Sequence, residues 1–536
     1  MLHVKSTRYG CLLIVLLALA GCGGGGGSDD GGSGNGGNDG NGDGTGAVDG
    51  GDTVVPPITV GSAGDESWSA ALRWLDVVKH SDRFDECHGD DAMQCSRGAR
   101  SGSALGSAVF DWAEDELAAI PELRFHQRQI WDFPVYKPDA YSLEVQTASG
   151  NFSPAVFPWY YTGQTGADGV SGDLIGYSAL ALGDRHTGKI VIVNFDPFLN
   201  AGVETVTDSI LHLRDQGAAG VVAISEGPAN QIIAQTMSSL DELAGIPVLI
   251  VGKQDGEQLR DMIGNPARLV LDARYETRPT HNSADASGVP VPGVNVMAYL
   301  PGADSSNIVV IGTPLNSLLL AAGERAPGAG IFVYLARYFA QLSREQGPPP
   351  YSIYFVATGG HEVYGYGLGR FFACLPTDRL VAYVHLGSGL VYQGYDQSSG
   401  EPVARDGMHQ TRTLSNSENL ILRAITDQAF GSASLQPLFN LPPSLFNPGE
   451  ASVAYSANVP TISISGTNPY FHTAADDQDQ IYKPALGDMA LAYRSAVEGI
   501  LATDADSLRN ANVLAGILGG TPPQFECPAP LEAPLP

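Results

Sequence analysis

The sequence IVVIG at residues 308–312 decides the fold. A continuous β-branched run of this length is typical of a strand that is buried on both faces. Similar runs follow at residues 351–357 and 381–386, and residues 329–344 have the pattern of a helix. Strands that alternate with helices at this spacing predict an α/β fold with a mainly parallel sheet and helices on both faces.

Residues 145–280 have the pattern of a second, smaller unit. Three short apolar stretches, at 188–193, 217–224 and 245–251, are typical of buried strands, and residues 209–216 are typical of a helix. This order predicts a small β-rich module inserted into the main domain. A generic α/β unit has similar short strands with glycine turns and is the alternative.

The rest of the chain divides around this insert. We expect residues 65–144 to form the N-terminal part of the main domain, 281–505 its main part and 506–536 a C-terminal tail. Apolar residues recur at helical spacing within 68–130, which predicts helices over that segment.

The functional residues are expected where the strands end, because ligand-bearing residues of a parallel sheet lie at the carboxyl ends of its strands. Following the predicted strands in order, these positions hold Pro314, Asn316, Gly323, Glu324, Gly359-Gly360-His361-Glu362, Gly387 and Tyr470-Phe471-His472.

The glycine-flanked His361-Glu362 motif and the terminal Tyr470-Phe471-His472 motif resemble the catalytic domain of the M28-type zinc aminopeptidases. The module at 145–280 resembles the protease-associated (PA) domain that is often inserted in such peptidases. The resemblance implies a zinc-exopeptidase-like fold. It also implies five side-chain ligands to two zinc ions, with an insert near the mouth of the active site.

Three of those five ligand positions hold residues that cannot bind a metal. By the resemblance, Pro314 stands where the family has a histidine ligand, and Asn316 stands where an aspartate orients that histidine. Gly323 stands at the aspartate that bridges both zincs, and Gly387 at an aspartate ligand of the second zinc. A slip of one residue in the register would let Glu324 take the bridging place.

Two ligand positions keep a competent side chain. The resemblance assigns Glu362 and His472 as residual metal ligands and puts His361 at the general-base position, where a histidine can accept a proton near neutral pH. His385 lies two residues before Gly387, about 7 Å back along the strand. Glu362 and His472 alone fall short of the three protein ligands that catalytic zinc sites use.

We therefore expect a peptidase-like protein that is inactive or much weakened and binds peptides or a protein partner without a cofactor. The alternative is an active metallo-aminopeptidase with one zinc ion. That ion would be held by Glu362, His472 and either Glu324 or His385, with His361 as base.

The N-terminus predicts export and a lipid anchor. Basic residues precede the apolar run 11–20, which is too short to span a membrane but suits a signal peptide. It ends in Leu19-Ala20-Gly21-Cys22, which resembles a bacterial lipoprotein signal, so 1–21 would be removed and Cys22 lipidated. Residues 22–64, rich in Gly and Asp, have little to bury and predict a disordered tether. The expected location is the outer membrane, facing the periplasm or the outside; an ordinary secretory signal is the alternative.

Composition and cysteines fit an exported protein. The chain has 536 residues, 43% hydrophobic, with Lys+Arg 29 against Asp+Glu 58 and a net charge of −29, which argues against a nucleic-acid partner. The cysteines after the anchor predict two disulfides, Cys87 with Cys95 and Cys374 with Cys527. A zinc site that includes His88 is the alternative for the first pair.

Overall fold

The computed structural model describes residues 61–80, 98–177, 185–196, 200–227, 230–237, 244–278, 293–363, 365–396, 403–408, 412–445, 448–512 and 525–527. The predicted lipidation site Cys22 and the predicted pair Cys87 and Cys95 lie outside these residues. No helix within the described ranges is long and apolar enough to cross a membrane.

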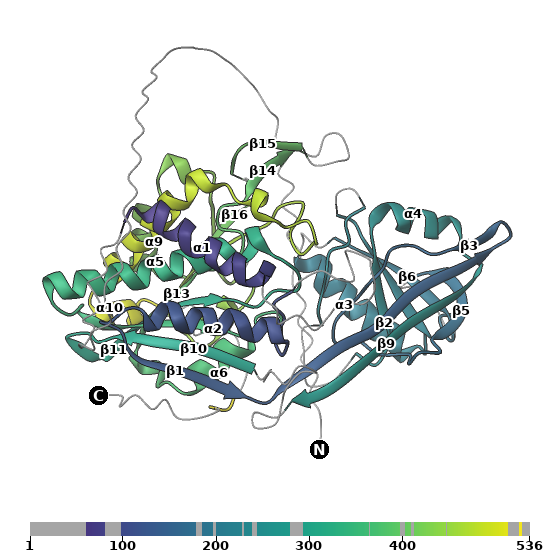
Figure 1. Cartoon of the computed structure of the whole chain (residues 1–536), viewed down its shortest axis with the longest axis horizontal. Coiled ribbons are helices and arrows are strands. Elements are labelled where there is room, and N and C mark those ends of the chain that lie inside the picture. The colour runs from purple at the N-terminus through teal and green to yellow at the C-terminus, as the bar shows by residue number, and fades with distance from the viewer. Residues whose placement is uncertain are drawn as a thin grey trace, which may run out of the picture. The chain divides into compact units, whose positions relative to one another are not determined.

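The main domain is built on an eight-stranded mixed sheet (Figure 1). Its strands β12, β11, β13 and β18 run parallel and form the centre, with antiparallel pairs on both sides. In spatial order the strands are β1 (Arg124–Trp131), β10 (Gly293–Leu300), β12 (Tyr351–Thr358), β11 (Asp304–Pro314), β13 (Leu380–His385), β18 (Thr461–Gly466), β16 (Arg412–Asn416) and β17 (Phe439–Leu441). The predicted α/β fold is confirmed.

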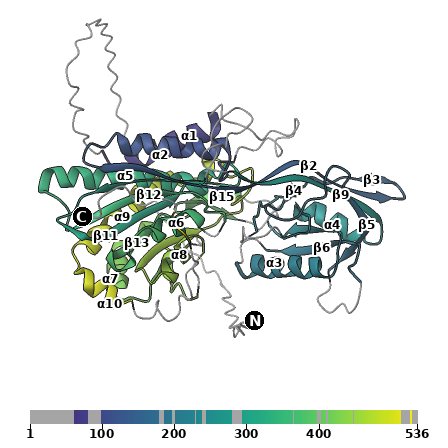
Figure 2. The ribbon, with the colours of Figure 1, turned by 90° about the horizontal axis from the view of Figure 1, so that it is seen from below.

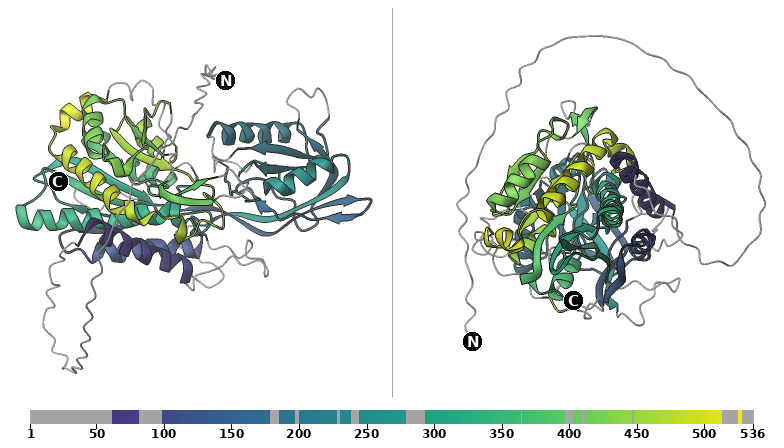
Figure 3. Two further views of the ribbon diagram at one scale, coloured as in Figure 1. Left: turned by 90° about the horizontal axis from the view of Figure 1, so that it is seen from above. Right: turned by 90° about the vertical axis from the view of Figure 1, so that its left-hand side faces the viewer.

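Helices cover both faces of this sheet, because the buried strands have two apolar faces. In β11, Val309 and Ile311 belong to one core, and Ile308 and Val310 belong to the other. The first core is shared with α1 (Ala63–His80), α2 (Ala104–Ala118), α5 (Ala322–Gln346), α7 (Leu420–Ala429), α9 (Leu486–Leu501) and α10 (Ala505–Asn510). The second is shared with α6 (Tyr366–Ala373) and α8 (Ala451–Ser456). Figure 3 shows α1 and α2 side by side on the first face.

The helix prediction was wrong at the end of the segment 68–130. Its first two helices exist as α1 and α2, but residues 124–131 form strand β1, which pairs with β10. The local pattern is misleading because Gln129 is fully buried while Ile130 is 40% exposed. Gln129 accepts a hydrogen bond from Asn295 on β10 at 3.0 Å, so a tertiary contact fixes this strand.

The insert has its own eight-stranded sheet and core. Its longest strands, β2 (Phe133–Thr147) and β9 (Pro266–Arg278), form an antiparallel pair that Figures 1 and 2 show as a long ribbon. The sheet therefore takes in residues upstream of 145. The other elements are β3 (Gly150–Phe152), β4 (Phe157–Pro158), β5 (Val170–Gly176), β6 (Ile190–Phe195), α3 (Asn200–Asp215), β7 (Gly220–Ser225), β8 (Val248–Val251) and α4 (Lys253–Asp261).

Two further features complete the described fold. A small hairpin of β14 (Gln393–Asp396) and β15 (Val403–Met408) lies outside both large sheets. The predicted disulfide between Cys374 and Cys527 is confirmed, with the two Cα atoms 4.8 Å apart. It ties the C-terminal tail to the end of α6.

Candidate functional site

Three acidic or histidine side chains meet at the carboxyl ends of the central strands. Glu324 lies in the first turn of α5, Glu362 follows β12, and His472 lies in the loop after β18. One ligand atom of each lies within 4.8 Å of the others, and among the described residues this is the group with the spacing to hold a metal ion. The structure thus brings together the two residual ligand positions and Glu324.

The glycine beside Glu324 cannot contribute. A Cβ atom added to Gly323 would lie 2.2 Å from Cε1 of Tyr392, so the ring of Tyr392 requires glycine there. The backbone N–H of Gly323 donates to Oδ1 of Asp476 at 2.9 Å, and that of Glu324 donates to Oδ2 at 3.2 Å. Asp476 therefore caps the start of α5 and fixes the direction of Glu324.

Arg325 stands between the two carboxylates, and sequence reasoning missed it. Its Nη2 lies 2.6 Å from Oε1 of Glu362 and 2.8 Å from Oε1 of Glu324. Its Nε donates to the carbonyl of Asn316 at 2.8 Å, and the side chain is 1% exposed. A guanidinium stays charged in proteins, so this is a permanent cation inside the site.

His472 links the carboxylates to the insert. Its Nε2 lies 3.2 Å from Oε1 of Glu324 and 3.9 Å from Oε2 of Glu362, and its Nδ1 lies 3.1 Å from the carbonyl oxygen of Ala234. Burial alone would lower the pKa of His472, but the two carboxylates raise it above its usual value. The ring thus contacts the two carboxylates on one side and the insert on the other.

The carboxyl groups of this cluster differ in their ionisation. Burial disfavours the charge of Glu324, yet Arg325 and His472 outweigh burial and lower its pKa to about 2. Burial, and after it the nearby charge of Glu324, raise the pKa of Asp476 to about 8, against the two backbone N–H groups that lower it. Glu324 is therefore the anion of this pair near neutral pH.

A second buried carboxylate, also missed from sequence, lies beside the general-base position. Oε1 of Glu450 accepts from the hydroxyl of Thr358 at 2.7 Å, and Oε2 lies 3.6 Å from Nδ1 of His361. His385 lies 3.7 Å from Oε1 and belongs to this second cluster, outside the group of Glu324. Burial lowers the pKa of His385 to about 4, so it is neutral. Burial raises the pKa of Glu450, but the charge of His361 lowers it overall.

The remaining family positions serve the fold. Pro314 ends β11 and has no donor atom. The side chain of Asn316 accepts from Ser101 at 2.7 Å and from the N–H of Gly360 at 3.0 Å, which ties the loop after β12 to the N-terminal segment. A Cβ atom added to Gly387 would lie 2.4 Å from the carbonyl oxygen of Ile464, so no side chain fits there.

These residues suit one zinc ion and do not suit two. Glu324, Glu362 and His472 supply the three protein ligands that catalytic zinc sites use. Oε2 of Glu324 is buried without a hydrogen-bond partner, which leaves it free to bind an ion. Pro314 and Gly387, which the resemblance placed at two further ligand positions, carry no ligand atom.

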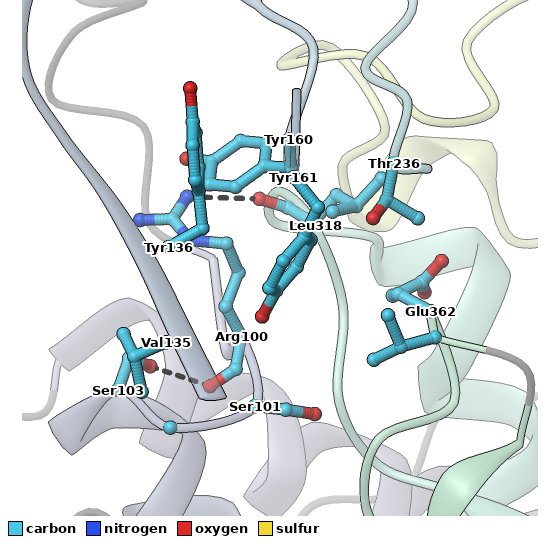
Figure 4. A pocket seen from close by; sticks show the side chains of 12 residues that line it. Arg100, Ser101, Ser103, Val135, Tyr136, Tyr160, Tyr161, Thr236, Leu318 and Glu362 are labelled. Atoms are coloured by element: carbon cyan, nitrogen blue, oxygen red, sulfur yellow. Dashed lines mark hydrogen bonds between the residues drawn. The ribbon is translucent and has the colours of Figure 1, made fainter. Parts of the chain in front are cut away.

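A pocket leads from the insert to Glu362. Its walls include the rings of Tyr136, Tyr160 and Tyr161 from the insert, and Figure 4 shows these rings around Arg100 with Glu362 beyond them. The guanidinium of Arg100 lies over the ring of Tyr160, 4.9 Å from its centre. The residues that line this pocket therefore come from both the insert and the main domain.

Comparison with solved structures identifies the fold as that of zinc aminopeptidases. The aminopeptidase of Aneurinibacillus strain AM-1 is 17% identical with a TM-score of 0.54, over 81% of this chain and 95% of that one. A zinc aminopeptidase from Bacillus subtilis is 14% identical with a TM-score of 0.57, over 82% and 96%. A peptidase M28 precursor from Shewanella amazonensis is 16% identical with a TM-score of 0.59, over 82% and 98%. No family model matches the sequence, and no curated protein does.

Proposed function

We propose that this chain is a peptide-binding protein built on the zinc aminopeptidase fold, without hydrolytic activity. The observation that carries the proposal is the guanidinium of Arg325, which is bonded to both Glu324 and Glu362. These carboxylates would serve metal ions in a hydrolytic site. Here a protein cation neutralises them, and a guanidinium cannot activate water as a metal does.

The buried position of Arg325 strengthens this reading. Its side chain and that of Glu324 are each 1% exposed, so their charges are held in a medium of low dielectric, where neither can be left unpaired at small cost. A metal ion would have to compete for these two carboxylates with the guanidinium of Arg325, which is part of the chain. The same ion pairs keep Glu362, which is 12% exposed, in a fixed orientation at the floor of the cleft.

The proposed ligand is a peptide or an extended segment of a partner protein. The tyrosine lining beside Glu362 supports this, because aromatic walls with a few polar groups are typical of ligand sites, although the pocket has a volume of only about 20 Å³ and must widen to admit a peptide. The proposal includes a lipid anchor at Cys22 and a location in the cell envelope, as the sequence of the first 64 residues predicts. The insert would then be a PA-like docking face.

The first test is metal content. The protein from about residue 61 onward is incubated with excess zinc, desalted and analysed by elemental mass spectrometry. We expect essentially no zinc, no release of p-nitroaniline from alanine and leucine p-nitroanilides, and saturable binding of short peptides labelled at their C-terminus. The variant Glu362→Ala should weaken peptide binding. One bound zinc together with hydrolysis would overturn the proposal.

One observation favours a second candidate, a single-metal aminopeptidase. Oε2 of Glu324 is free, and Glu362 and His472 complete a three-ligand set around it. A metal bound there would polarise a peptide carbonyl and lower the pKa of a bound water molecule. His361, with Glu450 beside it, is the group that this candidate assigns to proton transfer. It requires one zinc per chain, lost in Glu324→Gln and in His472→Ala, and hydrolysis that stops in both variants.

A further inference from the structure

The insert contacts the cleft at the histidine itself. The backbone N–H of Ala234 donates to the carbonyl of His472 at 2.8 Å, and the carbonyl of Ala234 lies 3.1 Å from Nδ1 of the same residue. Ala234 and its neighbour Ile233 are fully buried. A single residue of the insert thus binds both the backbone and the ring of His472.

His472 adopts a backbone conformation that needs such support. Its φ is +57°, in the left-handed region, which a non-glycine residue keeps only when its surroundings fix it. Its ring bonds Ala234 on one side and Glu324 on the other, at 3.2 Å. The conformation is therefore held from both parts of the chain.

The anchoring segment also forms part of the pocket wall. The N–H of Tyr160 donates to the carbonyl of Gln235 at 3.0 Å, and the N–H of Met237 donates to the carbonyl of Tyr160 at 2.9 Å. Tyr160 and Thr236 line the pocket that also contains Glu362. A ligand that displaces this wall acts on a segment only two residues from Ala234.

We propose that Ala234 is a positioning residue for His472, so that the insert is a working part of the site. The carbonyl of Ala234 accepts the Nδ1 proton, and this fixes the ring orientation that directs Nε2 toward Glu324. The role holds whether Nε2 faces a carboxylate in a binding protein or a metal ion in an enzyme. It therefore goes beyond the proposed function and is independent of it.

The test removes the Ala234 N–H by the substitution Ala234→Pro. The matched control is Ala244→Pro, since Ala244 is also a buried alanine of the insert, and its N–H donates within the insert to Tyr161 at 3.2 Å. Hydrogen exchange is followed by mass spectrometry across the whole chain. ¹⁵N-histidine spectra report the hydrogen bond at Nδ1 of His472.

We expect Ala234→Pro to speed exchange in residues 470–474 by about tenfold or more, with little change in β11, and to weaken the hydrogen bond at Nδ1 of His472, because loss of the N–H contact frees the carbonyl of residue 234 to move. Ala244→Pro should leave both readouts of His472 unchanged. The proposal is overturned if exchange in residues 470–474 and the Nδ1 signal of His472 are both unchanged in Ala234→Pro, or if both proline variants change His472 equally, as a general loosening of the insert would do.

A second variant covers failure of Ala234→Pro to fold. His472→Asn keeps a residue that tolerates the left-handed region but removes the ring. Under the proposal, residues 231–237 then exchange faster while the sheet strands β6 and β7 of the insert do not. Unchanged exchange in 231–237 would overturn the proposal by an independent route.

Discussion

Nη2 of Arg325 lies 2.6 Å from Oε1 of Glu362, and Glu362 lines the pocket while the side chain of Arg325 is buried behind it, 1% exposed. This pair joins α5 to the loop after β12 without any metal. In a two-metal site the same carboxylate would need a cation beside it, and here the chain supplies that cation. The positive charge of the guanidinium therefore stands beside two buried carboxylates that would be costly to leave unpaired.

Replacement of Arg325 by methionine should allow the site to bind zinc. Arg325→Met leaves Glu324 and Glu362 buried without their cation, which costs about 3–5 kcal/mol of unfolding free energy in the metal-free protein. Zinc would replace the lost charge, so zinc should bind and raise the melting temperature of this variant while leaving the native protein unchanged. Calorimetry with zinc and with chelator measures this. Arg325→Lys is the control and should bind no zinc; equal zinc responses in all three proteins would contradict the prediction.

Much of the fold could be predicted from sequence because its signals are local. The apolar runs that became β11, β12 and β13 are continuous and bounded by turns, so they need no knowledge of the rest of the chain. The error at β1 arose where a polar residue, Gln129, is buried by its bond to Asn295. Such a bond depends on tertiary structure and leaves no periodic trace in the sequence.

The site was less predictable because its key contacts also depend on tertiary structure. Positions such as Pro314 and Gly387 could be recognised as lacking a ligand, because that conclusion needs only the residue type. The role of Glu450 depends on Thr358, which lies 92 residues away in sequence. Arg325 left one readable signal, a charged residue in a stretch of small residues at the start of a buried helix.

An aspartate at residue 387, the residue that the resemblance implies there, should not create a metal site in this chain. A Cβ atom at Gly387 would lie 2.4 Å from the carbonyl of Ile464, so Gly387→Asp should lower the unfolding free energy by about 1–3 kcal/mol without creating a metal site. Gly176→Asp is the control, since a Cβ atom there meets only Ile263 at 3.6 Å. Urea unfolding compares the two variants with the native chain. A stable Gly387→Asp protein that binds zinc would show that β18 can move aside.

The stability contributed by His472 should depend on pH. The pKa of His472 is raised in the folded state, so its contribution is fully present below about pH 6.5 and is lost as the pH rises through the raised value. In chelator, the difference in unfolding free energy between the native protein and His472→Gln should therefore shrink between about pH 6 and pH 9. Asp476 titrates in both proteins, so its effect cancels to a first approximation. A difference that stays constant, or that grows with pH, would mean that the pKa of His472 is not raised in the folded state.

The disulfide should stabilise the protein through the tail that it fastens. Cys374 and Cys527 are 153 residues apart, and loss of a bond that closes so long a loop should cost about 2–4 kcal/mol. The double variant Cys374→Ser, Cys527→Ser tests this by urea unfolding. Phe525→Ala in the oxidised protein is the matched comparison, because Phe525 packs on Gly369 and lies 5.2 Å from the ring of Tyr366. If the phenylalanine variant loses as much stability as the serine variant, the bond acts mainly by holding Phe525 on α6. A clearly smaller loss would assign most of the effect to restriction of the unfolded chain.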